Sequence, residues 1–278
     1  MTTTLRPTAP ERRTDDGGRS RTYQICVNSR PVGTVELATD AAFGPTVGRV
    51  LRLTVDERER RRGRGTVAAL AAEEVLRGWG CARVEIAVDA HATVALGLAH
   101  ALGYTERNRH LAKTLTTVPR LPEGTEGRPM TEAEFAAWES GARRGYAQDL
   151  ADRGVPAGQA RAKAEADHRH ALPDGQTSPG VIFSTLLHRG SPVGILWLVL
   201  RDRGPGRPGA HVYDIEVAEA HRRRGHGRSL MLLAEAQALA AGADRLGLNV
   251  FAGNTPALRL YTSLGYEPQS HHLYKPLL

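Results

Sequence analysis

Two short segments rich in arginine and glycine are candidates for binding an anion. They are residues 60–65 (RRRGRG) and 222–227 (RRRGHG), and each lies between an apolar segment and a helical one. Glycines at such a junction allow a tight turn whose backbone N–H groups point to one spot, at the positive end of the helix dipole. Because arginines flank that spot, each segment predicts a diphosphate site. The second segment contains neither Gly-Lys-Ser/Thr nor G-x-G-x-x-G, which excludes a P-loop and a dinucleotide fingerprint.

The two segments belong to an internal repeat. Residues 55–65 align with residues 217–227 at an offset of 162, and the match continues without a gap for some fifty residues. Within it, residues 102–104 (LGY) correspond to residues 264–266 (LGY). The chain therefore contains two copies of one fold.

The repeat predicts one domain for each copy. We expect a first domain at 23–118 and a second at 128–278, joined by a linker at 119–127 that is rich in proline and glycine. Residues 1–22 are polar, and we expect them to form a disordered tail.

Both copies predict the same order of elements, in which two strands joined by a turn precede a strand, a helix, a strand and a helix. The expected strands are 23–28, 32–38, 49–55 and 84–88 in the first copy and 181–188, 193–201, 211–217 and 246–251 in the second. The expected helices are 66–78, 93–102, 228–241 and 256–264, with a glycine- and proline-rich loop at 202–209.

Residues 131–172 precede the second copy and have no counterpart before the first. Thr131 and Glu134 form a candidate capping box, and an aromatic stripe follows at helical spacing. We interpret this stripe as core packing rather than as a substrate wall. The carboxylates of the segment read as a solvated helix face rather than as a site for a cation: Glu134, Glu139, Asp149 and Asp152. If the second copy alone handles a second substrate, this would explain why the helical pair precedes only that copy.

The composition excludes several classes of protein. The hydrophobic fraction is 41% and the charged fraction 24%, as in globular proteins, and no apolar run is long enough to span a membrane. Residues 1–22 contain no secretory signal. The two cysteines, Cys26 and Cys81, form neither a metal framework nor a disulfide scaffold. We therefore expect a cytoplasmic protein without a metal site.

The net charge of +7 comes almost entirely from arginine. Such an excess could indicate a polyanionic partner. Both arginine runs, however, fall inside the repeated segment, so one diphosphate site in each copy accounts for them without nucleic acid. The low aromatic fraction, 5%, also argues against base stacking.

Residues 222–227 resemble the pyrophosphate loop of the GNAT superfamily of acyl-CoA N-acyltransferases, whose motif is Gln/Arg-x-x-Gly-x-Gly/Ala. Residues 254–266 (NTPALRLYTSLGY) are similar to the family's Asn-x-x-Ala-x-x-x-Tyr-x-x-x-Gly-Phe/Tyr segment. The resemblance covers residues 128–278 fully and 23–115 only in their core, and the duplication is similar to the tandem arrangement of some members. It implies an α/β (α+β) fold of two tandem domains, each a mixed twisted sheet flanked by helices.

The resemblance also implies roles for residues of the second copy. Backbone groups of Ile215 and Val217 are expected to hold the acyl carbonyl and the pantetheine arm of the cofactor, acetyl-CoA or another acyl-CoA. Asn254 is expected to contact the pantetheine or to order the site. The residues expected at the diphosphate of CoA are Arg222, Arg223, Arg224, Gly225, His226, Gly227, Arg228 and Ser229.

Glu216 and Tyr261 are the candidate catalytic residues. Acyl transfer from a thioester to an amine needs a group that accepts the proton of the amine. Glu216 lies on the strand before the loop, where many family members place a carboxylate, although Tyr213, Asp214 and His211 are alternatives on the same strand. A thiolate leaves more easily when a hydroxyl donates a proton to it, and Tyr261 matches the family's usual general acid.

The first copy keeps the loop but not the groups that transfer protons. At the positions of Glu216, Asn254 and Tyr261 it has Thr54, Ala92 and Ala99. We therefore expect the first copy to be catalytically silent, and whether it binds CoA stays open. The residues of this second candidate CoA site are Val55, Arg60, Arg61, Arg62, Gly63, Arg64 and Gly65.

The sequence thus predicts an N-acyltransferase that moves an acetyl or other acyl group from CoA to a primary amine of a small molecule or peptide, by direct attack in the second domain. Two alternatives remain open: a longer-chain or carrier-protein-bound acyl donor, and a non-catalytic acyl-CoA-binding sensor. We expect no nucleic-acid or membrane partner, and either a monomer or a homodimer. The sequence does not specify the acceptor amine.

Overall fold

The structure, a computed structural model, describes residues 3–15, 17–40, 43–152, 155–200 and 209–277. The chain divides into two compact units, Met1–Arg107 with Ser270–Leu278, and Asn108–Gln269. Each unit contains one of the two arginine-glycine loops. The loop expected at 202–209 lies outside the described residues except for its last residue.

The first unit is built on a sheet with strand order β1-β3-β4-β5-β6-β13, and β2 pairs with β3. The pair β5–β6 is parallel and the others are antiparallel. Helix α1 packs on this sheet through Ala72 and Leu76, which lie in one core with Val35 and Leu37. The elements are β1 Thr3–Pro7, β2 Arg12–Arg13, β3 Arg19–Val27, β4 Arg30–Asp40, β5 Gly44–Val55, η1 Glu57–Glu59, α1 Arg64–Gly78, β6 Arg83–Asp89, α2 Thr93–Ala101 and β13 Glu267–Pro276.

The second unit has strand order β7-β12-β11-β10-β9-β8, in which the pair β11–β12 is parallel and the others are antiparallel. Mixed sheets with helices in both units confirm the expected fold class. The elements are β7 Thr105–Thr114, β8 Thr125–Pro129, α3 Glu132–Asp152, α4 Ala157–Ala171, η2 Gly175–Thr177, β9 Val181–His188, β10 Ser191–Leu200, β11 Ala210–Val217, η3 Glu219–His221, α5 His226–Ala240, β12 Arg245–Phe251 and α6 Thr255–Ser263.

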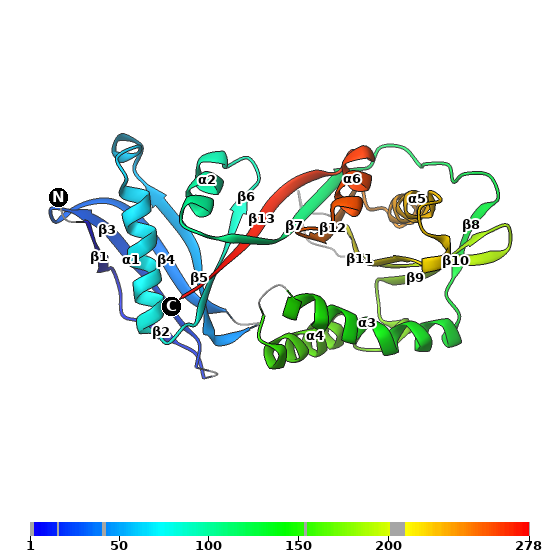
Figure 1. Cartoon of the computed structure of the whole chain (residues 1–278), viewed down its shortest axis with the longest axis horizontal. Coiled ribbons are helices and arrows are strands. Elements are labelled where there is room, and N and C mark those ends of the chain that lie inside the picture. The colour runs from blue at the N-terminus through cyan, green and yellow to red at the C-terminus, as the bar shows by residue number, and fades with distance from the viewer. Residues whose placement is uncertain (1–2, 16, 41–42, 153–154, 201–208, 278) are drawn as a thin grey trace. The chain divides into compact units, whose positions relative to one another are not determined.

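Helices cover both faces of the second sheet. Successive side chains of a strand point to opposite faces. In β10, Leu196 and Leu198 lie in the core that α5 and α6 share, whereas Trp197 and Val199 pack with Trp138 of α3. Figure 1 shows α5 and α6 on one side of these strands and α3 and α4 on the other. The aromatic stripe of α3 is therefore core packing, as expected.

The last strand of each repeat completes the sheet of the other unit. β7 follows the first copy in the chain but pairs with β12, with Leu111 opposite Leu248. β13 ends the second copy but pairs with β6, with Leu273 opposite Ile86. The repeat offset of 162 relates Leu111 to Leu273 and Ile86 to Leu248. The pairing of β7 with β12 therefore has the same register as the pairing of β13 with β6. The two copies have thus exchanged their final strands.

Three expected boundaries differ from the structure. Residues 3–7 form β1 and pair with β3, whereas a disordered tail was expected at 1–22. The end of the expected linker belongs to β8, which pairs with β9. Because the final strands are exchanged, neither of the expected domains, 23–118 and 128–278, is a continuous structural unit.

Candidate functional site

The second arginine-glycine loop leads from β11 through η3 into α5. Arg223 and Gly225 have positive φ angles of 61° and 88°, and α5 begins at His226. A left-handed φ favours glycine. A Cβ placed on Gly225 would meet nothing within 4 Å, so the space beside the loop is open. The turn is tight and leads into the N-terminal end of a helix, which suits a phosphate group.

Strands β11 and β12 separate toward this loop. They pair only at residues 210–212 and 246–248, although both strands continue beyond. On its other edge β11 stays paired with β10 as far as Val217. A Cβ on Gly194 of β10 would lie 2.5 Å from the carbonyl oxygen of Glu216, so only glycine fits there. The sheet therefore opens between β11 and β12 and remains closed on the other side of β11.

Backbone groups of Ile215 and Val217 face this opening. The N–H of Ala218 donates to the Val193 carbonyl at 3.0 Å. Hydrogen bonds between antiparallel strands involve every second residue, so Glu216 and Asp214 also direct their backbone N–H and C=O toward β10. Ile215 and Val217 alternate with these residues and direct their backbone N–H and C=O away from β10. The carbonyl of Val217 accepts a hydrogen bond from Arg222 Nε at 3.1 Å, which fixes the start of the loop.

Helix α6 carries the candidate general acid. Its N-cap is Asn254, whose side-chain oxygen accepts a hydrogen bond from the Ala257 N–H at 3.2 Å. Tyr261 lies further along the helix, is 6% exposed and packs edge-on to Tyr266. Burial, and to a smaller extent the charge of Asp214, raise the pKa of Tyr261 to about 12. The phenol therefore stays protonated at neutral pH, which is the form that donates a proton.

The two carboxylates of β11 have different surroundings. Glu216 is exposed, whereas Asp214 is only partly accessible and accepts a hydrogen bond from Trp138 Nε1 at 2.7 Å. Burial raises the pKa of Asp214, and the hydrogen bond from Trp138 opposes this rise. The charge of Asp214 also contributes to the raised pKa of Tyr261. The sequence indicates Asp214 only as an alternative base, and it contains no signal for the hydrogen bond from Trp138.

Three residues that follow Gly225 have neighbours of their own. The N–H groups of Arg228 and Ser229 both donate to the Gly225 carbonyl, Ser229 is buried, and the Arg228 guanidinium donates to Ser263 Oγ at 2.7 Å. His226 is buried near two other histidines. Burial lowers the pKa of His226, and the nearby His188, His221 and Arg224 lower it further. The side chains of His226 and Arg228 therefore contact other residues of the second unit.

The first arginine-glycine loop has the same backbone. Arg61 and Gly63 have φ angles of 58° and 71°, and Arg60 Nε donates to the Val55 carbonyl at 2.8 Å. As in the second copy, β5 stays in register with β4 up to Val55, and β5 and β6 pair only at 47–50 and 83–86. The frame of a cofactor site is therefore present twice.

A buried carboxylate engages the arginines of the first loop. Glu59 is 7% exposed and forms ion pairs with Arg64 at 2.7 Å, with Arg62 at 3.8 Å and with Arg30. In the second copy the corresponding residue is His221. The positive charge of the first loop is therefore partly neutralised within the chain.

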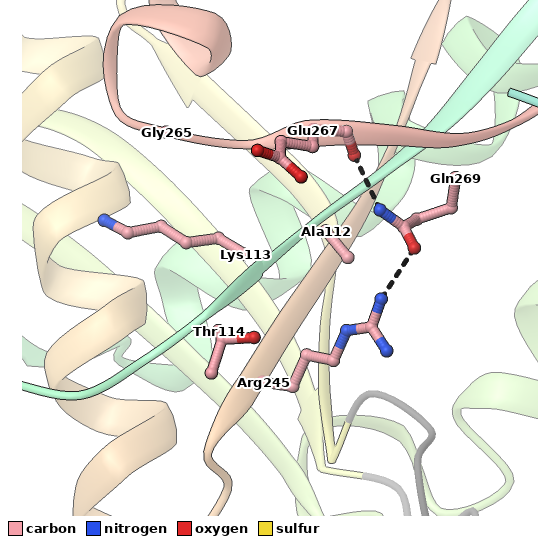
Figure 2. Close-up of a pocket in the computed structure, with 7 residues that line it drawn as sticks. All are labelled: Ala112, Lys113, Thr114, Arg245, Gly265, Glu267 and Gln269. Carbon is pink, nitrogen blue, oxygen red and sulfur yellow. Dashed lines mark hydrogen bonds between the residues drawn. The ribbon is translucent and has the colours of Figure 1, made fainter. Parts of the chain in front are cut away.

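A polar hollow in the second unit lies away from these groups, and no predicted site residue lines it. Figure 2 shows Arg245 donating to Gln269, whose amide donates to the backbone carbonyl of Glu267. β12 begins at Arg245, whereas the opening lies beyond Leu248 at its other end. The lining residues are Ala112, Lys113, Thr114, Arg245, Gly265, Glu267 and Gln269.

Neither a metal-binding cluster nor a membrane-spanning helix is found among the described residues. No group of three or more His, Cys, Asp and Glu side chains in this part of the chain is placed to hold a metal ion. No helix within it is long and apolar enough to cross a membrane.

Two segments of the chain, residues 2–104 and 153–266, match the model of the acetyltransferase (GNAT) family. The N-acetyltransferase YdgE of Bacillus subtilis strain 168, itself uncharacterised, is 30% identical over 155 residues, which are 53% of this chain and 95% of that protein. The mycothiol acetyltransferase of Jonesia denitrificans is 41% identical over 81 residues, which are 29% of this chain and 25% of that protein. A solved GCN5-related N-acetyltransferase from Sphaerobacter thermophilus superimposes with a TM-score of 0.57 at 18% identity, covering 92% of this chain and 80% of that one, which supports the fold.

Proposed function

This chain belongs to the acetyltransferase (GNAT) family, and on that premise we propose that its second copy transfers an acetyl group from acetyl-CoA to a primary amine of a small molecule or peptide. The observation that carries the proposal is the contrast between the two copies. Both have the same loop backbone and the same opening in the sheet. Only the second copy has Glu216 and Tyr261, where the first has Thr54 and Ala99.

The second copy fits the donor. Its loop has open space beside Gly225 and arginines that are not tied to a counterpart of Glu59. Backbone groups of Ile215 and Val217 face the opening, where the pantetheine arm and the acyl carbonyl would lie. When bound, acetyl-CoA supplies an acyl group that its thioester activates toward attack by an amine.

Two side chains then move the protons of the transfer. Glu216 accepts a proton from the amine nitrogen as the C–N bond forms. Tyr261 donates its phenolic proton to the sulfur as the C–S bond breaks, and solvent restores both side chains. The backbone N–H of Val217 at the opening stabilises the negative charge that develops on the carbonyl oxygen. The products are an amide and the free thiol of CoA.

We assign the first copy a structural role. It has no side chain that transfers a proton at the three corresponding positions, and Glu59 draws the charge of its loop arginines inward. Its contribution to the second unit is the strand β7, which completes the sheet beside β12.

The variant Tyr261→Phe tests this proposal. It removes the hydroxyl but keeps the ring that packs on Tyr266. We expect kcat to fall about 100-fold or more, because a general acid contributes about 10²–10⁴-fold. The measurement is the release of CoA thiol with a panel of primary amines, alongside the Kd for acetyl-CoA, which we expect to be unchanged. Full kcat in this variant would rule out Tyr261 as the general acid.

A further inference from the structure

Asp214 lies beside an irregularity of β11. In the pairing of β10 with β11, Trp197 lies opposite Asp214 and Leu198 opposite Val212, so Tyr213 is an extra residue and forms a β-bulge. A bulge re-aims the side chains next to it. Val212 packs in the core with α5, whereas Tyr213 packs with the aromatic core under α3 and Asp214 reaches a residue of α3. The bulge therefore directs the Asp214 carboxylate toward the helical pair.

The first copy has the same bulge without this carboxylate. There Leu51 is the extra residue and Arg52 follows it, at the positions of Tyr213 and Asp214. Leu51 is 46% exposed, and no segment similar to 131–172 precedes the first copy. The carboxylate and the helices beside it thus occur together, in the copy that retains the proton-transferring side chains.

Trp138 of α3 holds the carboxylate in place. Its Nε1–H donates to Asp214 Oδ2 at 2.7 Å. The neighbouring Trp197, whose ring centroid is 5.3 Å from that of Trp138, has a buried Nε1 without a hydrogen-bond partner among the described residues. Of these two neighbouring tryptophans, only Trp138 donates a hydrogen bond to Asp214. Trp138 therefore positions the Asp214 carboxylate in addition to packing in the core.

The charges around Asp214 favour a cationic ligand. Burial raises the pKa of Asp214, and the nearby carboxylates of Glu216 and Asp149 raise it further, whereas hydrogen bonds from Trp138 and the Ile215 N–H lower it. The charged groups with the largest effects on this pKa, Glu216 and Asp149, are both acidic. A carboxylate removed from water is stabilised when a cation pairs with it.

We infer that Asp214, positioned by Trp138, selects the acceptor by receiving a primary amine in its ammonium form, beside Glu216, which lies two residues further along β11 and therefore on the same face. This inference rests on the proposed acyl transfer in the second copy. An ammonium group offers three N–H donors, and a carboxylate accepts them with charge assistance. The acceptors are therefore alkylamines, which have a pKa of about 10 and are cationic at neutral pH, rather than neutral arylamines. The bound ammonium releases one proton to solvent before attack, so Glu216 remains the base.

The indole N–H signals of the three tryptophans provide a test that does not depend on turnover. We would titrate the acetyl-CoA-bound protein with n-butylamine, glucosamine and dialanine, and with 1-butanol as the uncharged control. We expect the Trp138 signal to shift and saturate with the amines but not with 1-butanol, and this response to vanish in Asp214→Asn. An unresponsive Trp138 signal, or an equal response in Asp214→Asn, would overturn the inference.

Kinetics provide the second measurement, with Trp197→Phe as the matched control for Trp138→Phe. We expect Asp214→Asn to raise the KM for the alkylamine about 10- to 100-fold, the range of a charge-assisted hydrogen bond, without changing the Kd for acetyl-CoA. Trp138→Phe should raise this KM in the same direction, and Trp197→Phe, which loses an indole N–H without a partner, should not. Equal effects of the two tryptophan variants would contradict a positioning role.

The two proposals fail in different ways. If amines shift the Trp138 signal but no CoA is released, the proposed acyl transfer fails and the ammonium site stands. If CoA is released and Asp214→Asn keeps the KM for the alkylamine, the acyl transfer stands and the ammonium site fails.

Discussion

At the scale of single residues, burial and charge prepare Tyr261 for its proposed role. A tyrosine near the surface has a pKa of about 10. Burial among the residues of α6 and the sheet, together with the charge of Asp214, raises that pKa to about 12. A raised pKa keeps the phenol protonated to higher pH, so the acid form persists across the whole physiological range.

This shift predicts the alkaline behaviour of Tyr261. The tyrosinate ultraviolet absorbance of the wild type, minus that of Tyr261→Phe, should stay near zero up to about pH 11, where an ordinary tyrosine is mostly ionised. An absorbance difference that rises with a midpoint near the ordinary pKa of about 10 would show that Tyr261 is not buried as described.

The residues of the candidate site were predicted from the sequence to different degrees. The loop arginines and Tyr261 lie within short motifs that resemble those of the GNAT family, and Glu216 lies on the strand just before the loop, so this resemblance indicated all of them. The hydrogen bond from Trp138 to Asp214 joins residues 76 positions apart, and the ion pairs of Glu59 reach as far as Arg30. Such contacts depend on how distant elements pack, which local patterns do not specify.

At the scale of elements, the start of α3 is held by one carboxylate. Glu134 accepts hydrogen bonds from the N–H and hydroxyl of Thr131, at 2.8 Å and 3.0 Å, which confirms the expected capping box. It also pairs with both guanidinium nitrogens of Arg128, at 2.7 Å and 2.8 Å, and accepts from Thr185. The hydrogen bond from Arg128 is the largest of the effects that lower the pKa of Glu134 to about 2.

We predict that Glu134→Gln lowers the free energy of unfolding by about 1 kcal/mol at neutral pH, because a capping interaction and a partly exposed ion pair are lost. A depressed pKa means that Glu134 stabilises the fold above the ordinary value of 4.5 and loses this effect as pH falls toward about 2. Urea unfolding of both proteins at several pH values measures the difference, which should shrink below pH 4.5.

The exposed Glu132 in the same helical turn supplies the control, since Glu132→Gln changes the net charge equally. We expect little effect from it. A difference between wild type and Glu134→Gln that persists unchanged at pH 2 would contradict this assignment.

The strands and helices around the loops were largely predicted, because each has a clear apolar period and because the repeat supplies every pattern twice. β9 has the predicted bounds, and α5 begins two residues earlier than expected, at His226. The strands β1, β2 and β8 were missed, since each is short and lies within a polar or proline-rich segment. The strands β7 and β13 were missed as well, since both consist mainly of polar residues.

At the scale of the whole molecule, two similar ion pairs accompany the exchanged strands. Lys275 of β13 bonds to Glu73 in the first unit at 2.7 Å, and Lys113 of β7 bonds to Glu235 in the second at 2.8 Å. Glu73 and Glu235 are 4% and 3% exposed. The repeat offset relates the two pairs, so each buried glutamate receives its lysine from the other copy's final strand.

A double-mutant cycle tests this exchange. Lys275→Met should destabilise the protein by about 3 kcal/mol, because Glu73 stays buried without its partner. Combined with Glu73→Gln, it should show a coupling energy of about 1 kcal/mol or more. Lys113→Met and Glu73→Gln, whose side chains lie in different pairs, should be additive. Coupling of Glu73 with Lys113 instead of Lys275 would show that the strands are not exchanged.

The sequence could not predict the exchange. Leu111 and Leu273 occupy the same position in the repeat, and either strand offers the same apolar register to β6 or to β12. Which strand pairs with which sheet therefore depends on the path of the chain, and the repeat makes the two choices nearly equal in local energy.

The second loop is the proposed donor site, and the calorimetric stoichiometry of acetyl-CoA binding tests this assignment most directly. We would compare Gly225→Asp with the matched Gly63→Asp, since aspartate tolerates the positive φ of both positions and repels a diphosphate. The asparagine variants at the same positions control for backbone effects. We predict one site in the wild type, lost in Gly225→Asp and retained in Gly63→Asp. Binding that survives Gly225→Asp and disappears in Gly63→Asp would place the donor in the first copy and contradict the account.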